Sequence, residues 1–327
     1  YVEYRALAPH DENASEDLID FHETILKAIR DACNQNFQAR YIVSLPRNSS
    51  LKCYDIIKEW LKLRPDLRPY IVGFDFCHLE EGFPPSKTQD FFSQLHEDNT
   101  NDPENSLSVT YHVGEIFFDK SLESSIRWCH EVAELGAVRL GHCIALGLDP
   151  YVSVKRTPDA HLFETISERI DQIQYDIKYC DELEDWGIEI SLQKLEEELK
   201  RLKQLPAERR IKRFYSKNRL IDVRIRQDFV LSQLKKLDVV IEVCPTSNFL
   251  LGCIPDPSVH PIHRFIESGV SLTIGSDDPG LFGRSLSEEI DWVAHNLKIS
   301  RSQLGRRLKN PLDFRLSKMR NSPSFRK

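Results

Sequence analysis

A histidine and a glutamate close an apolar run in the middle of the chain, at residues 109–115. The run is β-branched and aromatic and is broken by Gly114, which is typical of a buried strand that ends there. In a barrel, such a strand delivers polar side chains to its C-terminal end. His112 could hold a metal at that end, and Glu115 could move protons beside it. One His-x-x-Glu pattern is weak evidence, because a buried histidine satisfied by hydrogen bonds is the commoner case.

Three later stretches have the same form. Gly141 and His142 end the second, where glycine lets the backbone bend and histidine projects outward. The third, Glu242–Asn248, ends in Cys-Pro-Thr-Ser-Asn; its turn chemistry suits the lining of a pocket, and we expect structural support from it rather than catalysis. The fourth holds Asp277 and Asp278 before a proline. Adjacent carboxylates are costly to bring together unless a cation or a bound base accepts them, although an Asp-Pro pair equally suits the start of a helix.

Taken together, these strand ends predict a mononuclear metal hydrolase. Histidine nitrogens and carboxylate oxygens would hold zinc and leave one position for water. The metal would lower the pKa of that water, a nearby histidine would orient it, and a glutamate would protonate the leaving part of the substrate.

The elements that must position these residues alternate between strands and helices. At this spacing the alternation indicates βα units and a parallel sheet. The predicted strands cover residues 1–8, 39–45, 70–77, 109–112, 137–142, 239–243 and 271–274, and the predicted helices cover 18–33, 54–61, 122–135, 221–237 and 260–268, with a final helical region at 286–319.

The alternation breaks between about residues 147 and 236, a length unusual for a βα connection. Four leucines among Glu and Lys residues at 192–202 predict a short amphipathic helix. We therefore expect one barrel domain in three parts: strands 2–6 in residues 1–146, a charged helical insertion in 147–237, and strands 7–8 with C-terminal helices in 238–327. The insertion either packs on the barrel or serves as an assembly element of a homo-oligomer.

Bulk properties narrow the class of protein. The 327 residues carry a formal net charge of -7, which argues against a non-specific nucleic-acid binder, although a small anionic substrate needs only a local basic patch. Eight cysteines without a C-x-x-C pair suit reduced thiols, and no apolar run is long enough to span a membrane; we expect a cytoplasmic protein. The Lys/Arg-rich stretch from residue 300 onward is expected to be a solvated helix face and a frayed end.

The ordered motifs resemble those of the adenosine deaminase family, a zinc-dependent branch of the amidohydrolase barrels. They are His-x-Gly-Glu, Arg-x-Gly-His, Glu-x-Cys-Pro-x-Ser-Asn, His-Pro-x-x-x-Phe and Asp-Asp-Pro, which stand here at residues 112–115, 139–142, 242–248, 260–265 and 277–279. Residues 2–5 and 72–75 further resemble the second and fourth strands of that family. The resemblance implies a (β/α)8, TIM-like barrel with the insertion after strand 6, and hydrolytic deamination of adenosine or an adenine nucleotide to the inosine-type product and ammonia.

The resemblance also implies roles for individual residues. His112 and Asp277 would be zinc ligands, and Glu115 would donate a proton to the purine ring nitrogen beside the amino-bearing carbon. His142 would position the zinc-bound hydroxide, and Asp278 would hydrogen-bond the imidazole-side nitrogen of the purine.

One departure concerns the metal. The family takes two more zinc ligands from a His-x-His pair on its first strand, and this sequence contains no His-x-His. Since residue 1 already resembles the second strand, we expect that first strand to lie upstream or on another chain. The alternative is a barrel that has lost its metal and serves as a non-catalytic subunit of a large assembly.

The second departure concerns the pocket edge. His78 stands where the family usually has a glycine whose N–H meets the purine, so the preferred substrate could differ from adenosine, for example AMP or ATP. The long insertion is similar to that of enlarged deaminases of bacterial anti-phage (RADAR-type) systems, which would imply a role in antiviral defence. An amidohydrolase acting on another amine or amide stays open as well.

Overall fold

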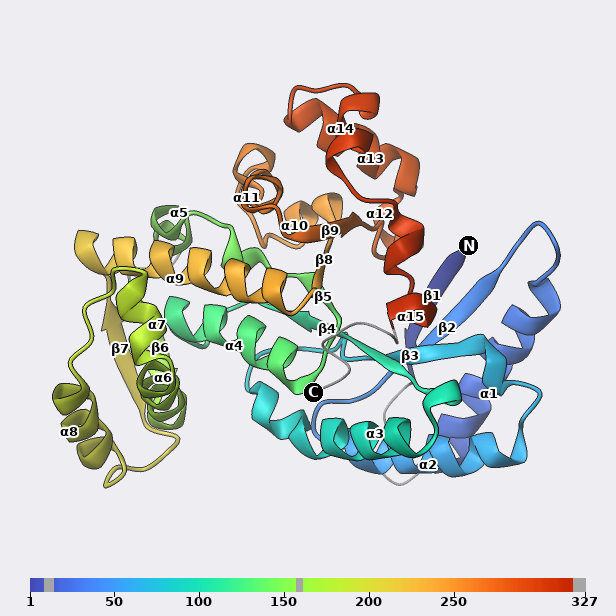
Figure 1. Cartoon of the computed structure of the whole chain (residues 1–327), viewed down its shortest axis with the longest axis horizontal. Coiled ribbons are helices and arrows are strands. Elements are labelled where there is room, and N and C mark those ends of the chain that lie inside the picture. Colours follow the sequence, from blue (N-terminus) through green and yellow to red (C-terminus); the bar gives the residue numbers. More distant parts are fainter. Residues whose placement is uncertain (9–14, 157–160, 320–327) are drawn as a thin grey trace.

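The structure, a computed structural model, describes residues 1–8, 15–156 and 161–319. Seven parallel strands form a half-barrel in the order β1-β2-β3-β4-β5-β8-β9 (Figure 1). They are β1 (Val2–Leu7), β2 (Ala39–Ser44), β3 (Ile71–Asp75), β4 (Ser108–Val113), β5 (Arg139–His142), β8 (Val240–Val243) and β9 (Ser271–Ile274). The predicted parallel α/β fold is confirmed. Within the described part of the chain, β1 and β9 each pair with one neighbour only, so the eighth strand and a closed barrel stay predictions.

Helices follow the strands and cover the outer face of the sheet. The larger ones are α1 (Ser15–Ala32), α2 (Ser50–Leu63), α3 (Gln89–Asn101), α4 (Leu122–Leu135), α9 (Lys217–Lys236), α11 (Ile262–Ser268) and α13 (Leu286–Asn296). Alternation along β2 shows how the sheet divides its side chains: Tyr41 and Val43 pack in the main core with the helices, whereas Ile42 belongs to a separate cluster. No described helix combines the length and the apolarity needed to cross a bilayer.

The separate cluster fills the inner face of the sheet with the C-terminal end of the described chain. Phe314, from a 3-10 turn (Pro311–Phe314), and Leu316 and Met319, from α15 (Leu316–Met319), pack on Ile42 and on valines of three other strand regions. Gly73 on β3 makes room for β4 and for this C-terminal plug, because an added Cβ would lie 2.3 Å from the backbone oxygen of Ser108 and 2.8 Å from the Leu316 side chain. The prediction of a solvated face is therefore wrong for residues 311–319, since three apolar residues spaced among Lys and Arg turn inward; residues 320–327 lie outside the described residues.

The insertion also differs from its prediction. It holds α5 (Pro150–Lys155), α6 (Ile166–Lys178), α7 (Cys180–Asp185) and α8 (Leu192–Leu202), but it also holds an antiparallel hairpin of β6 (His161–Thr165) and β7 (Arg210–Phe214) (Figure 1). The purely helical prediction is wrong here, because β7 (Arg-Ile-Lys-Arg-Phe) holds three basic residues among five and lacks the strict alternation that signals a strand. Helix α9 packs against α4 and so belongs with the barrel helices.

Candidate active site

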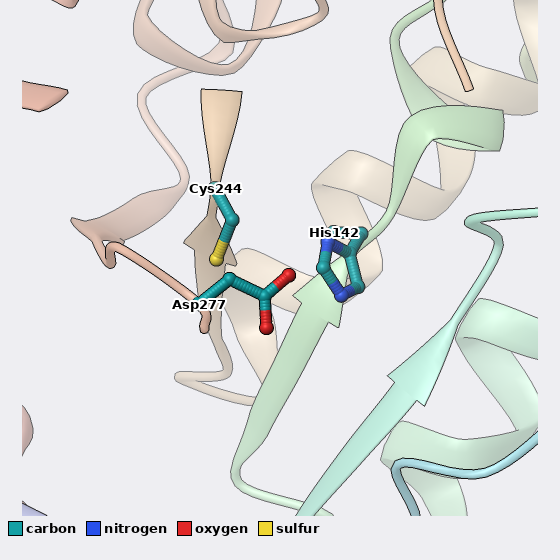
Figure 2. Close-up of side chains that lie close together, drawn as sticks. All are labelled: His142, Cys244 and Asp277. Atoms are coloured by element: carbon teal, nitrogen blue, oxygen red, sulfur yellow. The ribbon is translucent and has the colours of Figure 1, made fainter. Parts of the chain in front are cut away.

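Three side chains from separate strand ends converge at the C-terminal edge of the sheet. His142 ends β5, Cys244 follows β8 and Asp277 follows β9 (Figure 2). One ligand atom from each lies within 4.8 Å of the other two. Carboxyl ends of parallel strands meet at one edge, which is why residues 135 positions apart can share a site.

Unusual backbone conformations aim these side chains. His142, Cys143 and Asp277 have φ of 64°, 50° and 55°, in the left-handed region that side chains other than glycine rarely adopt. Such conformations cost of the order of 1–3 kcal/mol each and persist only where the surroundings impose them. The strand ends of β5 and β9 are thus built to project a histidine and a carboxylate into the mouth of the half-barrel.

His112, at the end of β4, is oriented by a buried carboxylate. Its Nδ1 lies 3.1 Å from Oδ1 of Asp75, which is fully buried at the end of β3 and also accepts a hydrogen bond from Thr110 (2.6 Å). This contact leaves Nε2 of His112 as its available nitrogen, and its ring centroid lies 5.0 Å from that of His142. Burial disfavours a charged imidazole, but the Asp75 carboxylate outweighs burial and raises the pKa of His112. The Asp75 carboxylate thus makes Nε2 of His112 more basic, and a cation bound there would replace the proton, because a ligating imidazole is neutral.

Glu115 follows β4 and its carboxylate is held from one side. Its Oε1 accepts hydrogen bonds from Asn248 Nδ2 (3.4 Å) and from the Cys253 thiol (3.6 Å), and lies 3.5 Å from Nδ1 of His142. Its backbone N–H donates to Oε2 of buried Glu80 (3.1 Å). A carboxyl group fixed in this way and still 18% exposed is suited to proton transfer with a bound molecule.

The other predicted site residues lie at different depths. Asp277 is half-buried and accepts a hydrogen bond from Ser247 Oγ (2.5 Å), whereas Asp278 is exposed at the start of the short helix α12 (Pro279–Phe282). His78 is also exposed, and its carbonyl accepts a hydrogen bond from Arg47 (3.1 Å). The structure thus brings His112, Glu115, His142 and Asp277 together and leaves Asp278 and His78 at the rim.

Sequence reasoning missed the residues that support this site. Asp75 lies inside the strand predicted at 70–77, and a lone carboxylate within an apolar run is the signal that could have found it. Asn248 was assigned structural support only, yet it contacts both Glu115 and His142. Cys244 was interpreted as a buried thiol; burial, with Glu242 and Asp277 adding to it, raises its pKa well above the usual range. A thiol that keeps its proton is a poor ligand until a cation displaces that proton.

The donor atoms fit a zinc ion. An imidazole nitrogen and a carboxylate oxygen, from His112 and Asp277, are the ligand types zinc takes, and His142 and Cys244 add a nitrogen and a sulfur nearby. His112 is not one of the three residues whose atoms lie within 4.8 Å of one another. Two ligand sets are therefore consistent with this geometry, and Asp277 belongs to both.

Comparisons with known proteins point in one direction. A family model described as adenosine deaminase matches residues 221–317. An adenine deaminase of Rhizobium meliloti is 38% identical over 84 residues, 26% of each chain, and an adenosine deaminase of Plasmodium gallinaceum is 32% identical over 76 residues, 23% of this chain and 21% of that one. The matched segments thus span about a quarter of those relatives' length. The solved structure of Arabidopsis ADAL with IMP shares the fold over 98% of this chain and 72% of that one, with a TM-score of 0.52 and 16% identity.

Proposed function

We propose that this chain, whose residues 221–317 match a family model described as adenosine deaminase, removes the exocyclic amino group of an adenine compound by hydrolysis. The main support for this proposal is that Glu115 Oε1 lies 3.5 Å from Nδ1 of His142, and that Asp277 lies beside His142. An acid, an orienting imidazole and a metal-binding carboxylate are what addition of water to a purine ring requires. Water replaces the amino group, which leaves as ammonia, and the product is of the inosine type.

Each of these residues has a defined task in that reaction. Glu115 protonates the ring nitrogen beside the amino-bearing carbon, so that the carbon becomes open to attack. His142 orients the attacking water, and exposed Asp278 meets the imidazole side of the purine from the rim. Zinc, when bound, lowers the pKa of water to near neutrality. Exposed His78 would shape the edge of the pocket that receives the purine.

The zinc would be held by Asp277 and His112, the two ligands that the resemblance assigns to this sequence. The alternative set is His142, Cys244 and Asp277. Zinc per chain, measured by elemental analysis, separates the two. We expect Asp277→Ala and His112→Ala to lose zinc and Cys244→Ala to keep it; loss in Cys244→Ala with retention in His112→Ala would assign the alternative set.

The activity itself is tested by ammonia release from adenine, adenosine, AMP and ATP. Glu115→Gln keeps the size of the side chain but removes the acid, so we expect turnover to fall by a factor on the order of 10² or more, with folding and zinc content unchanged. Glu104→Gln, an exposed glutamate near the opposite end of β4, is the matched control. Unchanged turnover in Glu115→Gln would remove Glu115 from the mechanism.

The panel also ranks the substrates. Nucleotides are included because the Arabidopsis neighbour was solved with IMP, and the free base because the rhizobial relative is an adenine deaminase. If zinc is present but no ammonia is released from any of the four compounds, the result would favour an amidohydrolase that acts on another substrate. If no ammonia is released and the protein also lacks zinc, the result would favour a non-catalytic subunit. The insertion, with its hairpin and α8, would then be the assembly surface.

A further inference from the structure

We propose that His260 and Asn248 are positioning residues that hold His142 in the tautomer with its proton on Nε2. In that tautomer His142 meets the attacking water as a hydrogen-bond donor and not as a base. The role of the water rests on the proposed function, whereas the tautomer follows from hydrogen bonds alone.

The series of hydrogen bonds begins at a backbone group that can only donate. The N–H of Ile262, the first residue of α11, donates to Nδ1 of His260 (3.0 Å). Nδ1 of His260 must therefore carry a lone pair. His260 is 2% exposed, and burial, with His263 and His142 adding to it, lowers its pKa to about 3. The ring is thus neutral near pH 7, and its one proton lies on Nε2.

That proton fixes the side-chain amide of Asn248. Nε2 of His260 donates to Oδ1 of Asn248 (3.3 Å), and Asn248 is fully buried, so water does not compete. The amide nitrogen then faces the other way and donates to Glu115 Oε1 (3.4 Å). A reversed amide would set its oxygen against the Glu115 carboxylate and its N–H against a histidine N–H. Both neighbours therefore select one orientation.

The same amide nitrogen lies 2.9 Å from Nδ1 of His142, whereas Glu115 Oε1 lies 3.5 Å from it, so the shorter contact with Asn248 decides the state of this nitrogen. Since two N–H groups cannot share a hydrogen bond, Nδ1 of His142 accepts and its proton lies on Nε2. His142 is 2% exposed and its backbone is held at φ 64°, so the ring has little freedom to exchange this partner for solvent. To act as a base, Nε2 would have to give up its proton and Asn248 would have to turn against Glu115.

These hydrogen bonds give the His-Pro motif a role in positioning the side chains of the site. The proposed mechanism gives no role to the His-Pro motif at residues 260–261, yet the hydrogen bonds of His260 fix the orientation of the Asn248 amide in the site. Asn248 contacts Glu115 and His142 at once, and so it couples the position of the acid to the tautomer of the imidazole.

The test is ¹⁵N NMR of the zinc-loaded full chain labelled at histidine, because protonated and unprotonated ring nitrogens resonate in separate regions. The His142 signals are assigned by their loss in His142→Gln. We expect an unprotonated Nδ1 and a protonated Nε2 in the wild type at neutral pH. The reverse pattern in the wild type would overturn the proposal whether or not any variant folds.

Variants then test the cause. A carboxylate can only accept, so Asn248→Asp should move the His142 proton to Nδ1 and lower kcat by about 100-fold or more, while KM changes little. Asn101→Asp, which adds the same charge at an exposed position of α3, should change neither. An unchanged His142 tautomer in folded Asn248→Asp would sink the proposal.

Two substitutions of His260 test whether a side chain that can donate a hydrogen bond is sufficient to keep the tautomer of His142. Gln can still donate to Oδ1 of Asn248, so His260→Gln should keep the wild-type tautomer, whereas His260→Leu should give mixed tautomers. Equal His142 spectra for the two variants would contradict the proposed series of hydrogen bonds from His260 through Asn248 to His142. A wild type with the expected tautomer but no activity on any adenine compound would end the proposed function and leave the tautomer assignment standing.

Discussion

At the scale of single residues, the site depends on partners that never touch the substrate. Asp75 is fully buried behind His112, accepts from Thr110 and lies in the field of Arg5. Burial would raise its pKa, but His112 and then Arg5 hold the pKa of Asp75 far below its usual range. It therefore stays ionised and can fix one face of the imidazole while the other faces the mouth.

This predicts a specific effect of Asp75→Asn. The amide keeps the size of the side chain but loses the charge that orients His112, so zinc affinity should fall by about 10- to 100-fold. Affinity is measured by titration against a competing chelator, with circular dichroism to confirm folding. Asp98→Asn, at a partly exposed ion pair with Lys58, is the control and should leave zinc affinity unchanged. Equal affinities for the two variants would show that Asp75 does not orient a ligand.

At the scale of elements, the strand ends depend on tight turns against neighbouring helices. Gly114 has φ of +65°, and a Cβ added there would lie 2.8 Å from the Cys129 sulfur on α4 and 3.2 Å from Ala145. The glycine thus lets the end of β4 approach α4 closely enough to place Glu115 at the mouth.

Gly114→Ala should therefore destabilise the fold by more than its backbone conformation explains. The matched control is Gly82→Ala, whose φ is +77° but whose added Cβ meets no atom within 4 Å. Both variants pay about 1 kcal/mol for the left-handed conformation, and Gly114→Ala should lose roughly 1–3 kcal/mol more from overpacking. Urea unfolding gives both values, and similar losses would mean that the Cys129 contact relaxes without cost.

At the scale of the whole molecule, buried neutral histidines link stability to pH. His22 and His130 are almost fully buried, and burial lowers the pKa of each to about 4. His22 is hydrogen-bonded to the Tyr41 hydroxyl, and His130 to the Tyr175 hydroxyl. In the unfolded chain a histidine titrates near 6.5. As the pH falls from 6.5 towards 4, these histidines bind protons in the unfolded state but not in the folded state. The free energy of unfolding therefore falls.

Between pH 7 and pH 5, each such histidine should cost on the order of 2 kcal/mol of unfolding free energy. His130→Gln should therefore lose less stability than the wild type over this interval, while being less stable at pH 7 through the lost contact with Tyr175. His96→Gln, at an exposed position, should follow the wild-type pH dependence. Parallel pH profiles for His130→Gln and the wild type would show that His130 takes up its proton in the folded state.

The whole molecule also depends on the plug at the inner face of the sheet. Leu316 is fully buried there, whereas Leu312, four residues earlier, is 45% exposed. Leu316→Ala should cost about 2–5 kcal/mol of unfolding free energy, and Leu312→Ala should cost less than about 0.5 kcal/mol. Equal urea midpoints would mean that the plug adds nothing to stability.

The sequence by itself determined the parallel α/β arrangement and the strand ends that carry chemistry. Apolar runs broken by glycine or by paired carboxylates are local signals, because a buried strand must be apolar along its length and can turn polar only where it ends. The local pattern therefore predicts β9 with the bounds that the structure has, Ser271–Ile274, and it identifies His112, Glu115, His142 and Asp277 as candidate site residues.

Only the tertiary structure decided which groups hold those residues in place. The hydrogen bonds of Asp75 to His112 and of His260 to Asn248 join residues on different elements, and no local periodicity of the sequence encodes them. The inward turn of Phe314 and Leu316 and the hairpin of β6 and β7 were hidden by neighbouring charges for the same reason. Burial and pairing are properties of the assembled chain, so the tautomer of His142 could be inferred only after the fold had placed its partners.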